Sequence, residues 1–204
     1  MRNLIETINS VSIIGFVYVI FRYIQYEFLD VFNNSVLFSM FYIPAAVRVF
    51  SAIMFGYWAA AGIALGLLID ITYFRPEQLM MHEIIVRVLQ TAVGVVLSLL
   101  IWAKLSNKVS CLSNPNIDFQ NIDAFDILQI CLIQAFFNSA TAHLFYIWAP
   151  SINHQFDLYG YFIMFIGDLT GAFLIFILAN IMFSLLKRTR FFPHKHYDDT
   201  MNNQ

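Results

Sequence analysis

The chain has 204 residues, of which 60% are hydrophobic and 12% are charged, and its formal net charge at pH 7 is −2. A water-soluble domain has about 45–50% apolar and about 25% charged residues, so a soluble fold would leave much of this apolar surface in water. The sequence also lacks a basic patch interleaved with aromatic residues, which argues against nucleic acid as a partner. Composition therefore predicts an integral membrane protein in contact with membrane lipid.

Six apolar stretches follow one another along the chain, and a helix needs about 20 largely apolar residues to cross a bilayer. They cover residues 11–31, 37–55, 58–73, 82–105, 125–148 and 159–186. Pro44 lies inside the second stretch and disfavours helix at the residue before it, so this span is expected to be broken or re-entrant near its start. Gly56 predicts a tight connection to the third stretch.

The expected fold class is thus all-α: a polytopic membrane bundle of about six transmembrane helices over residues 1–186, with a basic and polar tail over residues 187–204. Cytoplasmic segments of membrane proteins carry an excess of Lys and Arg. With the N-terminus inside, the outer connections contain only Arg75, and the inner segments contain Arg2, Lys104, Lys108, Lys187, Arg188, Arg190 and Lys195. The sequence therefore predicts the inner (plasma) membrane, with both termini in the cytoplasm.

Polar residues inside the apolar stretches gather in the outer half of the expected bundle. An ionisable group in hydrocarbon is costly, so it usually faces the protein interior and has a partner. At about 1.5 Å of helix per residue, Arg48 and Asp168 lie at a similar depth, and we expect them to pair. An outward-facing polar pocket for a small ligand is predicted here. Its expected ligand-binding residues are Arg48, Asp70, Arg87, Gln134, Asn138, His143 and Asp168.

On the fifth stretch, Gln134, Asn138 and Thr141 are spaced to share one helix face, which is typical of a cavity lining or of an interhelical seam. Roles that involve no ligand are alternatives for the same residues. The Arg48–Asp168 pair is equally well explained as structural, and Asp70 and Arg87 as interfacial residues bonded to water and headgroups.

Three further patterns have structural interpretations. His143 fits a packing role better than a metal-ligand role, Arg22 and Glu27 could pair on the first helix, and the Gly62-x-x-x-Gly66 pattern favours close helix packing. The sequence contains none of the common hydrolase, metalloprotease or phosphate-loop motifs, so we expect no enzymatic activity, no cofactor and no metal.

Two segments carry a family resemblance. Pro44 precedes Gly56, Gly62 and Gly66, and Gly167-Asp168-Leu169-Thr170-Gly171 follows near the end. This arrangement resembles the membrane-associated sensor domain of the first MASE type, in which a proline starts a short helix and glycines follow at this spacing. The resemblance implies structural roles for Pro44 and for Gly56, Gly62, Gly66, Gly167 and Gly171. It also implies a stand-alone sensor-like module that signals to a membrane or cytoplasmic protein partner.

The chain departs from that family in several ways. The family usually has about eight helices and is fused to a kinase or cyclase output domain, which these residues do not include. Ala46 stands where the family tends to have another small residue, and Ile177 and Leu178 stand where a proline often follows the last element.

A second resemblance is to the vitamin-binding S-components of energy-coupling-factor transporters. Those small six-helix proteins often have a Phe-Gly turn followed by a glycine-rich helix ending in Asp, as Phe55-Gly56 to Asp70 do here. It implies the alternative function of a substrate-binding subunit of a vitamin or metabolite importer. A structural subunit of a membrane complex is a third alternative.

Overall fold

The computed structural model describes residues 2–29, 41–74, 79–106, 123–149 and 158–188, and over these ranges the chain is helical without strands. Helix α1 (Arg2–Ile24) continues into the π-helical segment η1 (Gln25–Leu29), and α3 (Trp58–Ile69) continues into η3 (Asp70–Phe74). The other helices are α2 (Pro44–Phe55), α4 (Met81–Leu105), α6 (Ala124–Trp148) and α7 (Leu158–Arg188). The predicted all-helical class is confirmed for these ranges.

Four of the helical segments are long and apolar enough to cross a membrane, judged by length and composition. They are Leu4–Phe28, Met81–Leu105, Ala124–Trp148 and Leu158–Ile181. The other two, Pro44–Phe55 and Trp58–Phe74, are shorter than the four. At about 1.5 Å per residue, α2 is roughly 18 Å long, against about 30 Å of bilayer hydrocarbon.

The short helices α2 and α3 are joined by one tight turn. Pro44 is the first residue of α2, where its missing N–H is not needed, and residues 41 and 42 lie outside any helix. Residues 37–40 of the expected second span lie outside the described residues. Gly56 has a φ of 56°, a left-handed conformation that favours glycine, and it ends α2 two residues before α3 begins. The predicted connection at Gly56 is confirmed.

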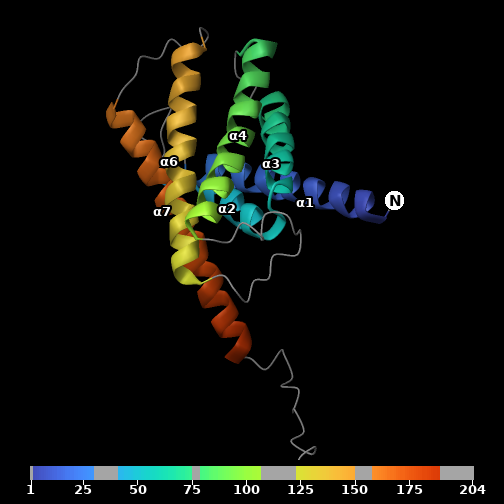
Figure 1. Cartoon of the computed structure of the whole chain (residues 1–204), viewed down its shortest axis with the longest axis vertical. Helices are drawn as coiled ribbons and strands as arrows, with labels where there is room; N and C mark the ends of the chain where they lie inside the picture. The colour runs from blue at the N-terminus through green and yellow to red at the C-terminus, as the bar shows by residue number, and fades with distance from the viewer. Residues whose placement is uncertain (1, 30–40, 75–78, 107–122, 150–157, 189–204) are drawn as a thin grey trace, which may run out of the picture.

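Helix α1 packs on α3 through glycines. A Cβ atom at Gly62 would lie 2.5 Å from the Ile14 Cβ, and one at Gly66 would lie 2.7 Å from the Gly15 carbonyl oxygen. Only residues without a side chain allow two backbones to approach so closely, which confirms the packing role expected for Gly62 and Gly66. In Figure 1, α1 runs across α4 and α6 rather than alongside them, so the helices do not form a bundle of mutually parallel rods.

Residue contacts fix the direction of the later helices. His82 at the start of α4 meets Trp148 at the end of α6, with ring centroids 5.9 Å apart. His143 near the end of α6 meets Tyr161 near the start of α7 at 5.6 Å. Helices α4, α6 and α7 therefore alternate in direction, which supports the alternation that successive membrane crossings require. The connections with the predicted charge asymmetry, residues 75–78, 107–122, 150–157 and 189–204, lie outside the described residues.

Candidate functional site

A buried ion pair joins α2 to α7. The Arg48 Nη2 donates to Asp168 Oδ1 at 2.6 Å, and both side chains are 2% exposed. The Asn138 Nδ2 on α6 donates to the other carboxylate oxygen, Oδ2, also at 2.6 Å. The predicted Arg48–Asp168 pairing is confirmed, and Asn138 completes it, so three helices meet at one carboxylate whose two oxygens are both bonded.

Asp70 belongs to a second ion pair, which the sequence analysis did not predict. The Arg22 Nε donates to Asp70 Oδ2 at 2.8 Å, and the Tyr26 hydroxyl donates to the same oxygen at 3.4 Å. Asp70 is 2% exposed, so its partner is a protein cation rather than water or headgroups. The suggested pairing of Arg22 with Glu27 is replaced by this contact.

The glycine contact between α1 and α3 explains this second pair. Arg22 and Asp70 each lie about two helical turns beyond Gly15 and Gly62, the residues at which the backbones approach. The two helices run in the same direction and touch at those glycines. Side chains two turns further along each helix therefore lie close together. The sequence does show that Arg22 and Asp70 lie at similar distances after small residues of their helices. This signal is useful only when it is known that α1 packs on α3.

Tyr42, just before α2, links the two ion pairs and was also missed by sequence reasoning. Its hydroxyl accepts a hydrogen bond from Arg22 Nη1 at 2.8 Å, and its ring centroid lies 5.3 Å from the Arg48 Cζ. Its backbone N–H donates to the Gly167 carbonyl at 2.9 Å. At Gly171, a Cβ atom would clash with the Tyr42 backbone carbonyl group. The missing side chain of Gly171 thus lets this tyrosine backbone approach α7, and Gly167 contributes its backbone carbonyl.

Arg87 on α4 is half-buried and is bonded differently. Its Nη1 donates to Gln90 Oε1 at 2.8 Å, and its Nη2 donates to the Tyr146 hydroxyl at 3.1 Å. Its Cζ lies 5.0 Å from the Tyr146 ring centroid and 5.2 Å from that of Phe145. Gln90 in turn donates to Thr141 Oγ1 at 2.6 Å. Arg87 therefore lies against α6.

The shared face of α6 is a seam between two neighbours. Asn138 bonds α7 through Asp168, whereas Thr141 bonds α4 through Gln90. Gln134, the third member, is 2% exposed, and its Oε1 has no hydrogen-bond partner within the described part of the chain. Of the two interpretations of this face, an interhelical seam explains these contacts.

His143 is a buried packing residue. It is 1% exposed, its Nδ1 lies 3.2 Å from the Ser139 carbonyl oxygen, and its ring contacts those of Tyr161 and Tyr146. Among the described residues, no group of three or more His, Cys, Asp or Glu side chains is placed to hold a metal ion.

Several buried polar atoms have no hydrogen-bond partner among the described residues. They include Arg48 Nε of the first ion pair, and Gln134 Oε1 and Ser139 Oγ on α6, the helix that also carries Asn138. An unmade hydrogen bond of a buried polar group costs about 1–3 kcal/mol, so such atoms usually bond to water or to a ligand. These groups include both donors and acceptors of hydrogen bonds.

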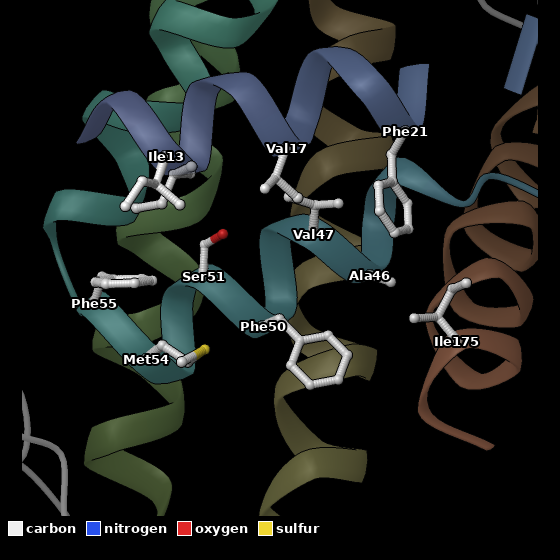
Figure 2. Close-up of a pocket in the computed structure, with 11 residues that line it drawn as sticks. Ile13, Val17, Phe21, Ala46, Val47, Phe50, Ser51, Met54, Phe55 and Ile175 are labelled. Atoms are coloured by element: carbon white, nitrogen blue, oxygen red, sulfur yellow. The ribbon is translucent and has the colours of Figure 1, made fainter. Parts of the chain in front are cut away.

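An apolar groove lies elsewhere in the fold. It has a volume of about 330 Å³ and is formed by α1, α2 and Ile175 of α7, as Figure 2 shows. Ser51 is the one polar residue of its lining, which includes Val17, Phe50 and Met54. None of the seven expected ligand-binding residues lines this groove. The groove is therefore distinct from the polar pocket that the sequence predicts.

Comparisons with known proteins add no relative. No protein-family model matches the chain, and neither the curated proteins nor the solved structures contain a match. The resemblances to MASE-type sensor domains and to transporter S-components therefore stay predictions.

Proposed function

We propose that this chain is a membrane-embedded sensor-like module that binds a small ligand from the outer side and passes its state to a partner protein. One observation supports the proposal: within the described part of the chain, polar atoms of Arg48, Gln134 and Ser139 are buried without hydrogen-bond partners, on two of the three helices that meet at Asp168. A ligand that bonds to these atoms would offset the cost of burying them. Because Arg48, Asn138 and Asp168 come from three helices, ligand binding there would change how α2, α6 and α7 pack.

The ligand-binding test uses the protein purified in a mild detergent. Native mass spectrometry should detect a co-purified small molecule on the wild type. The double variant Arg48→Ala/Asp168→Ala removes both charges and should stay folded but lose the molecule. Retention by the double variant, or a wild type without a bound small molecule, would contradict the proposal.

The proposal includes a membrane arrangement. The protein lies in the inner (plasma) membrane, and both termini are cytoplasmic. The four long helices cross the bilayer, with α1 strongly tilted relative to α4 and α6. The pair α2–α3 enters from the outer side and returns, either as two complete crossings, giving six, or as a re-entrant unit. Both alternatives leave the termini on one side, because the Gly56 turn sends the chain back.

Cysteine labelling tests this topology in a variant from which Cys111 and Cys131 have been removed. Single cysteines at Gln78 and Asn153 should react with a membrane-impermeant reagent in intact cells. Cysteines at Ser113 and Thr200 should react only after the membrane is opened. Labelling of the second pair in intact cells would reverse the orientation.

A structural subunit of a membrane complex is the second candidate. It is favoured by the saturation of Asp168, whose two carboxylate oxygens are already bonded within the chain. This alternative expects a stable stoichiometric complex and no ligand. The importer alternative rests on the resemblance to S-components and expects ligand uptake that depends on an ATPase module.

A further inference from the structure

We propose that the ligand of this module carries an anionic group, a carboxylate or a phosphate, and that Arg87 is the cation that binds it. The inference rests on the proposed function, since it names the ligand class for the same part of the molecule.

The three arginines Arg22, Arg48 and Arg87 differ in the groups to which they are bonded. Arg22 and Arg48 are each bonded to an aspartate. Arg87 is hydrogen-bonded to neutral acceptors, the Gln90 amide oxygen and the Tyr146 hydroxyl. Within the described ranges, its guanidinium is thus the one of the three that is not bonded to a carboxylate. A charged group in or near hydrocarbon favours a counter-ion strongly.

Glu83 lies one turn before Arg87 on α4, and its role differs. Its carboxylate caps the helix: Glu83 Oε2 accepts a hydrogen bond from the Met80 backbone N–H at 2.7 Å. The bonds of Arg87 run instead toward the α6 side of the helix. Glu83, the acidic residue closest to Arg87 in the sequence, therefore caps the N-terminus of α4.

Hydrogen bonds connect Arg87 to the buried charge centre by way of α6. Gln90, which accepts a hydrogen bond from Arg87, donates to Thr141 Oγ1, and Asn138, one turn earlier on α6, donates to Asp168. A further guanidinium donor is buried at that centre, because the Arg48 Nε has no hydrogen-bond partner among the described residues.

Two aromatic rings of α6 fix the position of the Arg87 guanidinium. The rings of Phe145 and Tyr146 lie within 5.2 Å and 5.0 Å of its Cζ, which fixes the plane of the guanidinium without neutralising it. A guanidinium has five N–H donors, and two of its nitrogens are bonded within the described residues. Arg87 is half-buried, whereas Arg48 is 2% exposed, so Arg87 is the more accessible of the two. A fixed, accessible arginine is suited to bidentate binding of a carboxylate or phosphate.

The anionic group could belong to a soluble ligand or to a lipid headgroup, and the experiment separates these sources. The soluble arm measures thermal unfolding in a neutral detergent, with sodium phosphate or succinate titrated at constant ionic strength against chloride. The lipid arm compares nanodiscs of phosphatidylcholine alone with nanodiscs that also contain phosphatidylglycerol, without added phosphate or succinate.

The wild type should show either a saturable rise of the unfolding midpoint with the soluble anion or a higher midpoint in the nanodiscs that contain phosphatidylglycerol. Arg87→Gln should weaken the apparent affinity by roughly tenfold to hundredfold, the effect expected for one charged hydrogen-bonding group. Arg87→Lys should bind with intermediate affinity, because it keeps the charge without the planar fork. It also serves as the informative variant if Arg87→Gln does not fold.

Lys104→Gln is the matched control, since it removes one positive charge from an exposed position at the opposite end of the same helix. It should bind like the wild type. The proposal is overturned if neither arm stabilises the wild type, if both Arg87 variants bind unchanged, or if Lys104→Gln loses as much affinity as Arg87→Gln. A neutral co-purified ligand in mass spectrometry would refute the anion inference alone, whereas an empty protein would refute the proposed function as well.

Discussion

Arg22–Asp70 and Arg48–Asp168 are the same chemical pair built in two different settings. The first follows a close glycine contact between α1 and α3, and its arginine is 12% exposed. The Tyr26 and Tyr42 hydroxyls supply it with further hydrogen bonds. The second joins α2 to α7, with both side chains 2% exposed and an amide as its third member. The free-energy cost of breaking either ion pair therefore depends on which groups remain to solvate the charge that has lost its partner.

Removing one arginine should therefore have unequal effects. Arg48→Ala leaves the Asp168 carboxylate buried with Asn138 as its remaining hydrogen-bond donor, and we expect a loss of about 3–5 kcal/mol in unfolding free energy. Arg22→Ala should cost less, about 1–3 kcal/mol, because Asp70 keeps the Tyr26 hydroxyl and the site is more accessible. SDS titration in mixed micelles measures both values.

The double variant Arg48→Ala/Asp168→Ala is the internal control for the first result. It should recover much of the stability lost in Arg48→Ala, because no isolated charge remains. Equal losses in the two single arginine variants would show that the two settings do not differ in energy.

The glycine contacts provide the next largest effect. Gly171→Ala would force the Tyr42 backbone away from α7, and Gly62→Ala would push Ile14 away from α3. Each should lower the unfolding free energy by about 1–3 kcal/mol, the usual range for overpacking. Gly94→Ala is the control, since a Cβ atom there meets only Thr141 Oγ1 at 3.6 Å. Gly94→Ala should be neutral or stabilising, and a loss as large as that of the other two would contradict this explanation.

Asn138→Ala tests the third member of the buried centre. It removes the hydrogen bond to Asp168 Oδ2 but leaves the ion pair, so we expect a loss of about 1–2 kcal/mol. The same titration measures it, and Asn138→Asp should be worse than alanine, because it places a second carboxylate beside the first. If Asn138→Asp is more stable than Asn138→Ala, the side chain at this position does not donate a hydrogen bond to Asp168.

Tyr42→Phe should have the smallest effect and the most specific one. It removes the hydroxyl that Arg22 bonds but keeps the ring beside Arg48, so the loss should be near the average of about 0.6 kcal/mol for hydrogen bonds between membrane helices. In double-mutant cycles it should be non-additive with Arg22→Ala and additive with Arg48→Ala. A coupling free energy of Tyr42→Phe with Arg48→Ala but not with Arg22→Ala would contradict the role of the Tyr42 hydroxyl as a partner of Arg22.

Prediction from sequence succeeded for Arg48 and Asp168 but not for Arg22 and Asp70. Both members of the first pair lie well inside apolar stretches, so their depth alone suggested that they meet. Arg22 and Asp70 lie near the ends of their helices, where water and headgroups are plausible partners. Their pairing depends on the contact of Gly15 with Gly62 and Gly66, which no periodicity along a single helix reveals.

The amino-acid sequence was enough to predict the all-helical class and the order of the polar residues along the apolar stretches, whereas four of its six expected spans are helices long enough to cross a membrane. These follow from local composition, because a hydrocarbon environment selects apolar runs of a fixed length whatever their neighbours are. It also determined the turn at Gly56, since a left-handed backbone is a local requirement.

Only the tertiary structure decided which polar groups share a partner. Tyr42, which follows no polar pattern, became the link between two ion pairs because its backbone rests on Gly167 and Gly171 of a distant helix. Likewise, Asn138 and Thr141, which share one face of α6, bond to different neighbours because α7 and α4 both pack against that helix. Hydrogen bonds and ion pairs act over a few ångströms, so the crossing of helices far apart in the sequence decides them.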